Sequence, residues 1–242
     1  MEMNDYFLVK NLFNYEKVIP PPKNLPSNLK TVYVTDSLEN VMLAKDLGWN
    51  SIKLITGYEH IVDSFERRKL VAFINSFPLK VVPELVDPRY IFICDSNIND
   101  LWVKYGEFVD NCTDKHALYV TSGFYRGDRD NMEIECQQSC KAPRWSYNHN
   151  GIRTSTDRYK QDLNENNIDY MGLSVVSAKY IGWNINHPKY DELSNVLYNE
   201  YLVNLQGNII LTYISGLYSE FVYNYHTNDY SGASVNKHNF QS

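Results

Sequence analysis

The chain lacks any long hydrophobic run. It has 242 residues, and none of its apolar stretches approaches the ~18 residues that a membrane-spanning helix needs. The first five residues, Met1-Glu2-Met3-Asn4-Asp5, also lack the basic start and apolar centre of a secretory signal peptide. From these two absences we expect a cytoplasmic protein with no membrane span.

Cysteine and positive charge are scarce as well. The four cysteines, Cys94, Cys112, Cys136 and Cys140, follow no Cys-x-x-Cys or paired zinc spacing, which favours reduced thiols over a disulfide framework. The formal net charge is −6, and the basic residues are scattered apart from Arg67-Arg68-Lys69. Nucleic acid is therefore not an expected partner.

Several catalytic signatures are missing. Neither a Gly-x-Gly-x-x-Gly loop nor a Walker pattern occurs, so dinucleotide oxidoreductases and P-loop kinases lose support. No Gly-x-Ser-x-Gly elbow occurs either, which leaves serine hydrolase chemistry without support. The length suits one domain with a sizeable core and is short for two.

Prolines mark the N-terminal part of the chain. Pro20-Pro21-Pro22 and Pro26 cannot donate ladder hydrogen bonds and favour extended backbone. We therefore predict a proline-containing strap over residues 1–30 and a single domain over residues 31–226. Residues 227–242 are rich in Asn, Ser and Gly, and we expect them to form a flexible tail.

From residue 31 onward the pattern is that of an α/β protein. A predicted strand over 31–36 is followed by Ser37 as N-cap, a helix over 38–47 and a second strand over 51–55. Such a βαβ unit predicts parallel strands with a right-handed crossover. Further predicted helices cover 60–77, 131–140, 154–166 and 188–204, further strands cover 90–94, 116–121 and 173–181, and 208–215 is ambiguous.

The apolar run Tyr90–Cys94 ends abruptly in Asp95-Ser96-Asn97. Side chains alternate along a strand, so Asp95 and Asn97 share one face, and oxygen ligands of this kind hold manganese or magnesium against a diphosphate. An ordinary Asx turn explains the same residues. Asp36 also follows a predicted strand, and ligands of such sheets bind beyond the carboxyl ends of the strands. The coincidence of the two aspartates favours a ligand site.

Five short motifs occur in a recognisable order: Tyr33-Val34-Thr35-Asp36, Leu47-Gly48-Trp49, Arg67-Arg68-Lys69, Lys80-Val81-Val82-Pro83 and Asp95-Ser96-Asn97. This succession resembles nucleotide-sugar-dependent glycosyltransferases of the GT-A fold. Residues 115–123 and 206–213 look like segments of the chlorovirus enzymes that build capsid-protein glycans.

The resemblance implies an α/β, GT-A-like (Rossmann-related) mixed and mostly parallel sheet flanked by helices. It also implies a metal-dependent transfer of a sugar from a UDP-sugar to a glycan or glycoprotein acceptor, with manganese or magnesium as cofactor. A viral origin would place the protein in the host cytoplasm.

Site residues follow from the same resemblance and from the chemistry of the side chains. The expected metal ligands are Asp95, Asn97 and His187, although a lone histidine is also often a hydrogen-bonded structural residue. Arg68 is the preferred phosphate ligand, with a solvated helix face as the alternative. The residues expected to bind the donor are Thr35, Asp36, Arg68, Lys80, Asp95 and Ser96.

An inverting reaction would also need a base. Glu133 and Glu135 are the candidates, and they are two residues apart, so only one can face a cleft from a helix. We prefer Glu135, with an exposed acidic helix as the alternative. Related glycosyltransferase-like proteins carry Asp where this chain has Gly207, so no catalytic role passes to that position.

Two other functions remain open. A non-catalytic module that binds nucleotide sugars would keep the cleft without turnover, and Asn97 in place of a second carboxylate fits that possibility. A nucleotidyltransferase would also need a metal carboxylate, but the sequence after Val34 lacks the glycine-rich nucleotide loop typical of that class.

Overall fold

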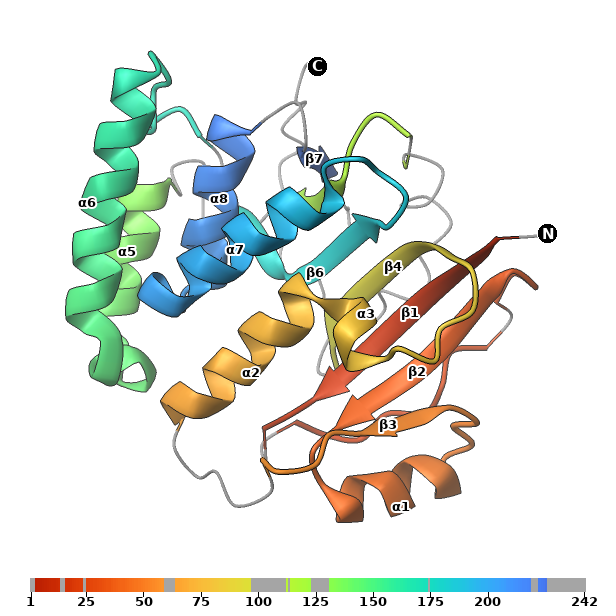
Figure 1. The fold of residues 1–242 in the computed structure, drawn as a ribbon. Coiled ribbons are helices and arrows are strands. Elements are labelled where there is room, and N and C mark those ends of the chain that lie inside the picture. Colours follow the sequence, from red (N-terminus) through yellow and green to blue (C-terminus); the bar gives the residue numbers. More distant parts are fainter. Residues whose placement is uncertain are drawn as a thin grey trace.

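The computed structural model describes residues 3–13, 16–23, 25–58, 64–96, 112, 114–122, 131–173, 175–218 and 222–225. Within these ranges, seven strands form one sheet in the order β3-β2-β1-β4-β6-β5-β7 (Figure 1). The strands are β1 (Asn4–Asn11), β2 (Leu29–Thr35), β3 (Ile52–Leu54), β4 (Pro88–Asp95), β5 (Leu118–Ser122), β6 (Val176–Asn184) and β7 (Val222–Tyr225).

The sheet is mixed and mostly parallel, as predicted. β1 runs parallel to β2 and to β4, and β2 runs parallel to β3. β6 is antiparallel to both β4 and β5, whereas β5 and β7 are parallel. The carboxyl ends of the first four strands therefore meet at one edge of the sheet, where open α/β sheets bind their ligands.

Strand β1 corrects the predicted domain start. Residues 1–30 were expected to form a strap, but Asn4–Asn11 pairs with both β2 and β4 in the middle of the sheet. Its apolar centre, Tyr6–Val9, is at most 4% exposed. The strap prediction is wrong for this segment, because a four-residue apolar run is enough for a central strand and the prolines begin only at residue 20.

The helices are α1 (Leu38–Asp46), α2 (Ser64–Ser76), α3 (Pro78–Val81), α5 (Met132–Lys141), α6 (His149–Glu165), α7 (Tyr190–Asn204) and α8 (Gly207–Leu217), with a 3-10 helix η2 at Pro143–Asn148. The ambiguous segment 208–215 is thus helical. No helix among the described residues is long and apolar enough to cross a membrane.

Two apolar clusters cover the two faces of the sheet. On one face, strand residues such as Leu8 and Ile93 pack with side chains of α2, α6, α7 and α8. On the other face, Phe7 and Phe92 pack with Ala44 of α1 and with Trp49. Figure 1 shows α1 apart from the other helices accordingly.

Local signals account for α1 well. The Ser37 hydroxyl accepts a hydrogen bond from the backbone N–H of Asn40 at 3.3 Å, which caps the helix. Gly48 follows the helix end with φ of +98°, a conformation that glycine adopts without a Cβ clash. The N-cap position of Ser37 was predicted from sequence and is confirmed.

Candidate functional site

A cavity of about 510 Å³ opens at the carboxyl ends of β1 and β4. Walls come from both strands, from β6, and from α2, α5, α7 and α8. Aromatic rings of Phe13, Trp145 and Tyr201 line part of it. Its charged lining residues are Lys10, Glu16, Arg68, Asp95, Glu135, Arg144 and Lys179.

Lys10 and Asp95 face each other at the end of the two central strands. They are register partners in the parallel β1–β4 pair. Their side chains lie on the face of the sheet that the larger helix layer covers, because they continue the alternation of Leu8 and Ile93. The Lys10 Nζ lies 2.6 Å from Asp95 Oδ1, with the lysine side chain 3% exposed and the aspartate 26%. The cavity therefore contains a buried ammonium beside the predicted metal ligand.

Glu16 adds a second carboxylate to this end of β1. Its Oε2 accepts backbone hydrogen bonds from Leu12 at 2.9 Å and Phe13 at 3.3 Å, which holds the turn after the strand. Burial, together with the nearby negative charge of Asp95, raises the pKa of Glu16 to about 7. A carboxyl group with a near-neutral pKa in a cleft is suited to proton transfer.

Arg68 reaches the same cavity from α2. Its guanidinium carbon lies 4.6 Å from the centre of the Phe13 ring and 4.7 Å from that of Trp145. Contact with two aromatic rings restrains the guanidinium, and such contacts with ring faces leave its N–H groups able to bind an anion. The cationic group is thus pre-oriented.

Arg67, the neighbour of Arg68, points elsewhere. Its Nη1 lies 2.6 Å from Asp36 Oδ2 and donates to the Leu12 carbonyl at 2.5 Å. Asp36 is buried in this ion pair and does not line the cavity, so it does not share one crevice with Asp95. β1 lies between the strands that carry the two aspartates, which separates them.

Three more residues predicted to bind the donor, Thr35, Ser96 and Lys80, are not among the residues that line the cavity. Thr35 is fully buried and its hydroxyl accepts the N–H of Ser37 at 3.2 Å. Ser96 is buried on the face opposite to Asp95, as alternation along the strand requires. Lys80 is exposed on α3 with its ammonium 4.0 Å from the Phe77 ring centre.

His187 follows the end of β6 that lies far from Asp95, so the two residues do not share a metal site. β6 is antiparallel to β4, and Asn184 pairs with Tyr90 near the start of β4, whereas Asp95 ends that strand. Five residues of strand, ~17 Å, lie between these positions. The prediction that His187 joins Asp95 is therefore wrong. Asn97 lies outside the described residues.

Glu135 faces the cavity and Glu133 does not. The Glu135 carboxylate accepts hydrogen bonds from the side-chain amides of Gln206 and Asn208, the latter at 3.1 Å. Glu133 instead pairs with Lys160 on α6, and hydrogen bonds from Lys160 and Gln137 keep the pKa of Glu133 below its usual value. Of the two predicted bases, only Glu135 lines the cavity.

Sequence reasoning missed Lys10, Glu16, Gln206 and Asn208. Lys10 carries the same signal as Asp95, a charged residue directly after an apolar run, and could have been found. Gln206 caps α8 by accepting the N–H groups of Asn208 and Ile209. No local pattern marks Glu16, Gln206 or Asn208, because their place in the cavity depends on tertiary packing.

Gly207 is needed where α8 begins. A Cβ at this position would lie 2.5 Å from Ala178 Cβ and 2.7 Å from Tyr201 Oη. We expect Gly207→Ala to lower the free energy of unfolding by about 1–3 kcal/mol, because α8 would have to move away from β6. Urea denaturation measures the change. Gly172→Ala is the matched control, since its Cβ would meet only atoms of Asp169, the nearest of them the side-chain Oδ2 at 3.3 Å; equal midpoints for the two variants would contradict the prediction.

The described residues contain no group of three or more His, Cys, Asp or Glu side chains that could hold a metal ion. From the described residues alone, a cation at Asp95 would receive too few protein ligands, and the others would have to come from residues outside the described ranges, from substrate or from water. This is how magnesium is often bound beside phosphates, with only one or two carboxylates from the protein.

No family model matches the chain, and no curated protein does. Among solved structures, the chain is similar to the apo form of the bifunctional glycosyltransferase WbbM, with a TM-score of 0.50 and 12% identity. The match covers 92% of this chain and 39% of that protein, so the chain spans about two fifths of WbbM.

Two other solved structures resemble the chain at lower scores. Apo mouse xyloside xylosyltransferase 1 has a TM-score of 0.44 and 10% identity, covering 92% of this chain and 84% of that protein. The 4-diphosphocytidyl-2C-methyl-D-erythritol synthase from Anaerococcus prevotii DSM 20548 has a TM-score of 0.47 and 9% identity, covering 96% and 90%. With the likeness to WbbM and the observed sheet, the α/β, GT-A-like fold predicted from sequence is confirmed.

Proposed function

We propose that this protein is a metal-dependent glycosyltransferase that moves a sugar from a UDP-sugar to a glycan or glycoprotein acceptor, which in a virus would be a capsid-protein glycan. The observation that carries the proposal is the cavity at the carboxyl ends of β1 and β4, where Asp95 lies with Lys10 and Arg68. Breaking the bond between the sugar and the diphosphate develops negative charge on the leaving oxygens. Cations fixed around the leaving oxygens stabilise this negative charge.

Asp95 fits the role of a metal ligand. Lys10 contacts its Oδ1, and the Asp95 side chain lines the cavity and is 26% exposed. The proposed site for manganese or magnesium is this carboxylate, with Asn97 as a second ligand and with the donor phosphates. The metal would supply positive charge for the leaving diphosphate.

The remaining roles follow from charge and position. Arg68, whose guanidinium lies over two aromatic rings, is the proposed ligand of the phosphates through its N–H groups. Glu135 is the proposed base, since its carboxylate is oriented toward the cavity by two amide donors. Phe13 and Trp145 keep water from one side of the phosphate site.

One observation favours a second candidate, a non-catalytic nucleotide-sugar-binding module. The Lys10 ammonium already neutralises Asp95, so the site could bind a nucleotide diphosphate with less need for a metal. Such a module would bind UDP but would neither hydrolyse nor transfer the sugar.

Calorimetric titration of UDP, with and without manganese, tests the proposal. We expect manganese-dependent binding that weakens at least tenfold in Asp95→Asn and in Arg68→Met. Asp95→Asn is preferred over Asp95→Ala because the amide oxygen can still accept from Lys10. Glu84→Gln, an exposed carboxylate outside the cavity, is the matched control and should bind like wild type.

The outcomes separate the candidates. If UDP, GDP, CDP and TDP all fail to bind, with and without manganese, neither the glycosyltransferase nor the binding module is supported. Binding followed by hydrolysis of a UDP-sugar supports the enzyme, whereas binding without hydrolysis or transfer across a panel of UDP-sugars supports the module.

A further inference from the structure

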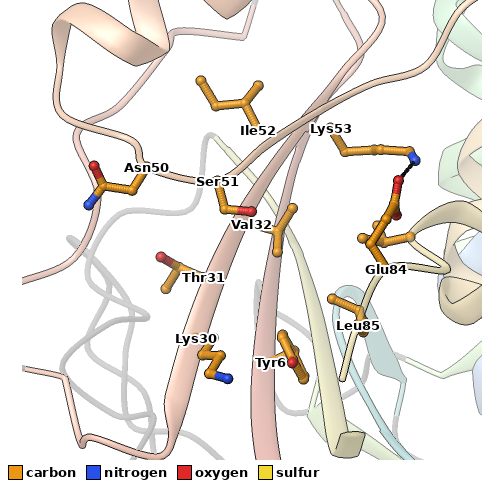
Figure 2. A pocket seen from close by; sticks show the side chains of 11 residues that line it. Tyr6, Lys30, Thr31, Val32, Asn50, Ser51, Ile52, Lys53, Glu84 and Leu85 are labelled. Carbon is orange, nitrogen blue, oxygen red and sulfur yellow. Dashed lines mark hydrogen bonds and ion pairs between the residues drawn. The ribbon is translucent and has the colours of Figure 1, made fainter. Parts of the chain in front are cut away.

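A second cavity lies under the amino-terminal half of β2. Its volume is about 520 Å³, within the ~300–1,000 Å³ common for ligand sites. Figure 2 shows Tyr6, Val32 and Leu85 around its apolar part, with Lys53 and Glu84 joined above them. Tyr6 precedes Lys10 by four residues on β1, so ~13 Å of strand separates this cavity from the one at Asp95.

Contacts within the protein hold the residues that line this cavity in place. Tyr6 and Val32 are each 4% exposed. The Tyr6 hydroxyl donates to the Val86 carbonyl and accepts from the Val86 N–H, both at 3.0 Å. The Lys53 Nζ lies 2.5 Å from Glu84 Oε1 and links β3 to the chain before β4. An occupant would find a preformed surface, which reduces the entropy lost on binding.

The sheet edge beside the cavity is open. Pairing of β2 with β3 begins only at Tyr33, opposite Ile52. The Tyr33 N–H donates to the Ser51 carbonyl at 2.9 Å, so odd-numbered residues of β2 direct their peptide groups to this side. Thr31 therefore presents its N–H and C=O to the open edge, and no described residue bonds them there.

The rim carries positive charge. Lys30 is exposed, and its ammonium lies 5.9 Å from the Tyr6 ring centre. It forms no ion pair with any described residue, whereas Lys53 is neutralised by Glu84. An occupant with a carboxylate would complement this rim.

We propose that this cavity binds an acidic peptide segment in extended conformation, added as a strand beside Lys30–Val32. A peptide backbone supplies both the donor and the acceptor that Thr31 requires, which is the recognition mode called β-augmentation. Alternate apolar side chains of the peptide lie on Tyr6, Val32 and Leu85, and an acidic side chain pairs with Lys30. The site is separate from the proposed transferase cavity and does not depend on its function.

Fluorescence anisotropy with a labelled, end-capped peptide of sequence Glu-Val-Thr-Val-Glu tests the proposal. Thr31→Pro should weaken binding at least tenfold while leaving thermal unfolding unchanged, because proline is tolerated where a strand N–H is unpaired. Lys30→Glu should weaken binding about tenfold and should favour a probe with lysine in place of glutamate. Lys45→Glu, an exposed lysine on α1, is the matched control.

Several results would overturn the proposal. One is no binding of the probe to wild type at 1 mM peptide, a concentration of order the Kd of weak peptide complexes. Another is equal binding of a backbone N-methylated probe, which would indicate a pocket for apolar small molecules. If Thr31→Pro fails to fold, the Thr31 N–H is engaged within the protein and the edge is not open.

Discussion

Glu16→Gln is expected to remove a pH dependence of stability worth about 3 kcal/mol. The pKa of Glu16 is raised from 4.5 to about 7 by burial and by the charge of Asp95. The folded state therefore holds the proton more tightly than the unfolded state. The contribution of Glu16 to the free energy of unfolding is full below pH 4.5 and is lost as the pH rises toward 7. Its size is about 1.4 kcal/mol per unit of pKa difference between the folded and unfolded states.

Urea denaturation at pH 4.5, 6 and 8 in the presence of a chelator measures this effect. The glutamine variant keeps the hydrogen bonds from Leu12 and Phe13 through its amide oxygen, so the difference reports the charge. Glu39→Gln, an exposed carboxylate on α1, is the control and should keep the slope of wild type. An identical pH slope in Glu16→Gln and wild type would show that Glu16 titrates alike in both states.

Local chemistry explains the elements that sequence predicted well. Ser37 marks the start of α1 and Asn131 that of α5, and both side chains accept the backbone hydrogen bond of an N-cap. The run Tyr90–Cys94 became β4 with Asp95 at its end. In each case the signal and the structure lie within a few residues of each other.

Non-local pairing explains the errors. The direction of β6 decides that His187 lies far from Asp95, and a predicted strand carries no information on its direction in the sheet. The place of β1 between β2 and β4 separates Asp36 from Asp95. Ser96 is different, since alternation along β4 already excluded it from the face of Asp95.

Within the candidate site, the ion pair between Lys10 and Asp95 shows what the sequence could predict and what it could not. Lys10 and Asp95 each follow an apolar run, so each alone could be predicted at a strand end. Their ion pair follows from the register of β1 against β4, which no local pattern sets. Which charges are paired in the cavity is therefore decided by strand pairing and not by local sequence.

Lys10→Met is expected to lower the free energy of unfolding by about 3 kcal/mol at pH 8. Methionine has a similar volume, so little cavity is created, but the one ammonium that contacts Asp95 among the described residues is removed. Loss of one partner from a buried ion pair leaves an uncompensated charge and typically costs ~3–5 kcal/mol. Because the Asp95 side chain is 26% exposed, we expect a loss of stability at the lower end of that range.

Double-mutant analysis tests the cause of that loss. Near pH 8 Glu16 is also charged, and its negative charge adds to that of Asp95 once Lys10 is gone. Lys10→Met should therefore cost about 1 kcal/mol less in a Glu16→Gln background, a coupling typical of neighbouring charges. Lys45→Met, at an exposed position of α1, should change stability by no more than about 0.5 kcal/mol. Equal stability of Lys10→Met and wild type would mean that the Lys10 ammonium is not the counter-ion that stabilises Asp95 in this cavity.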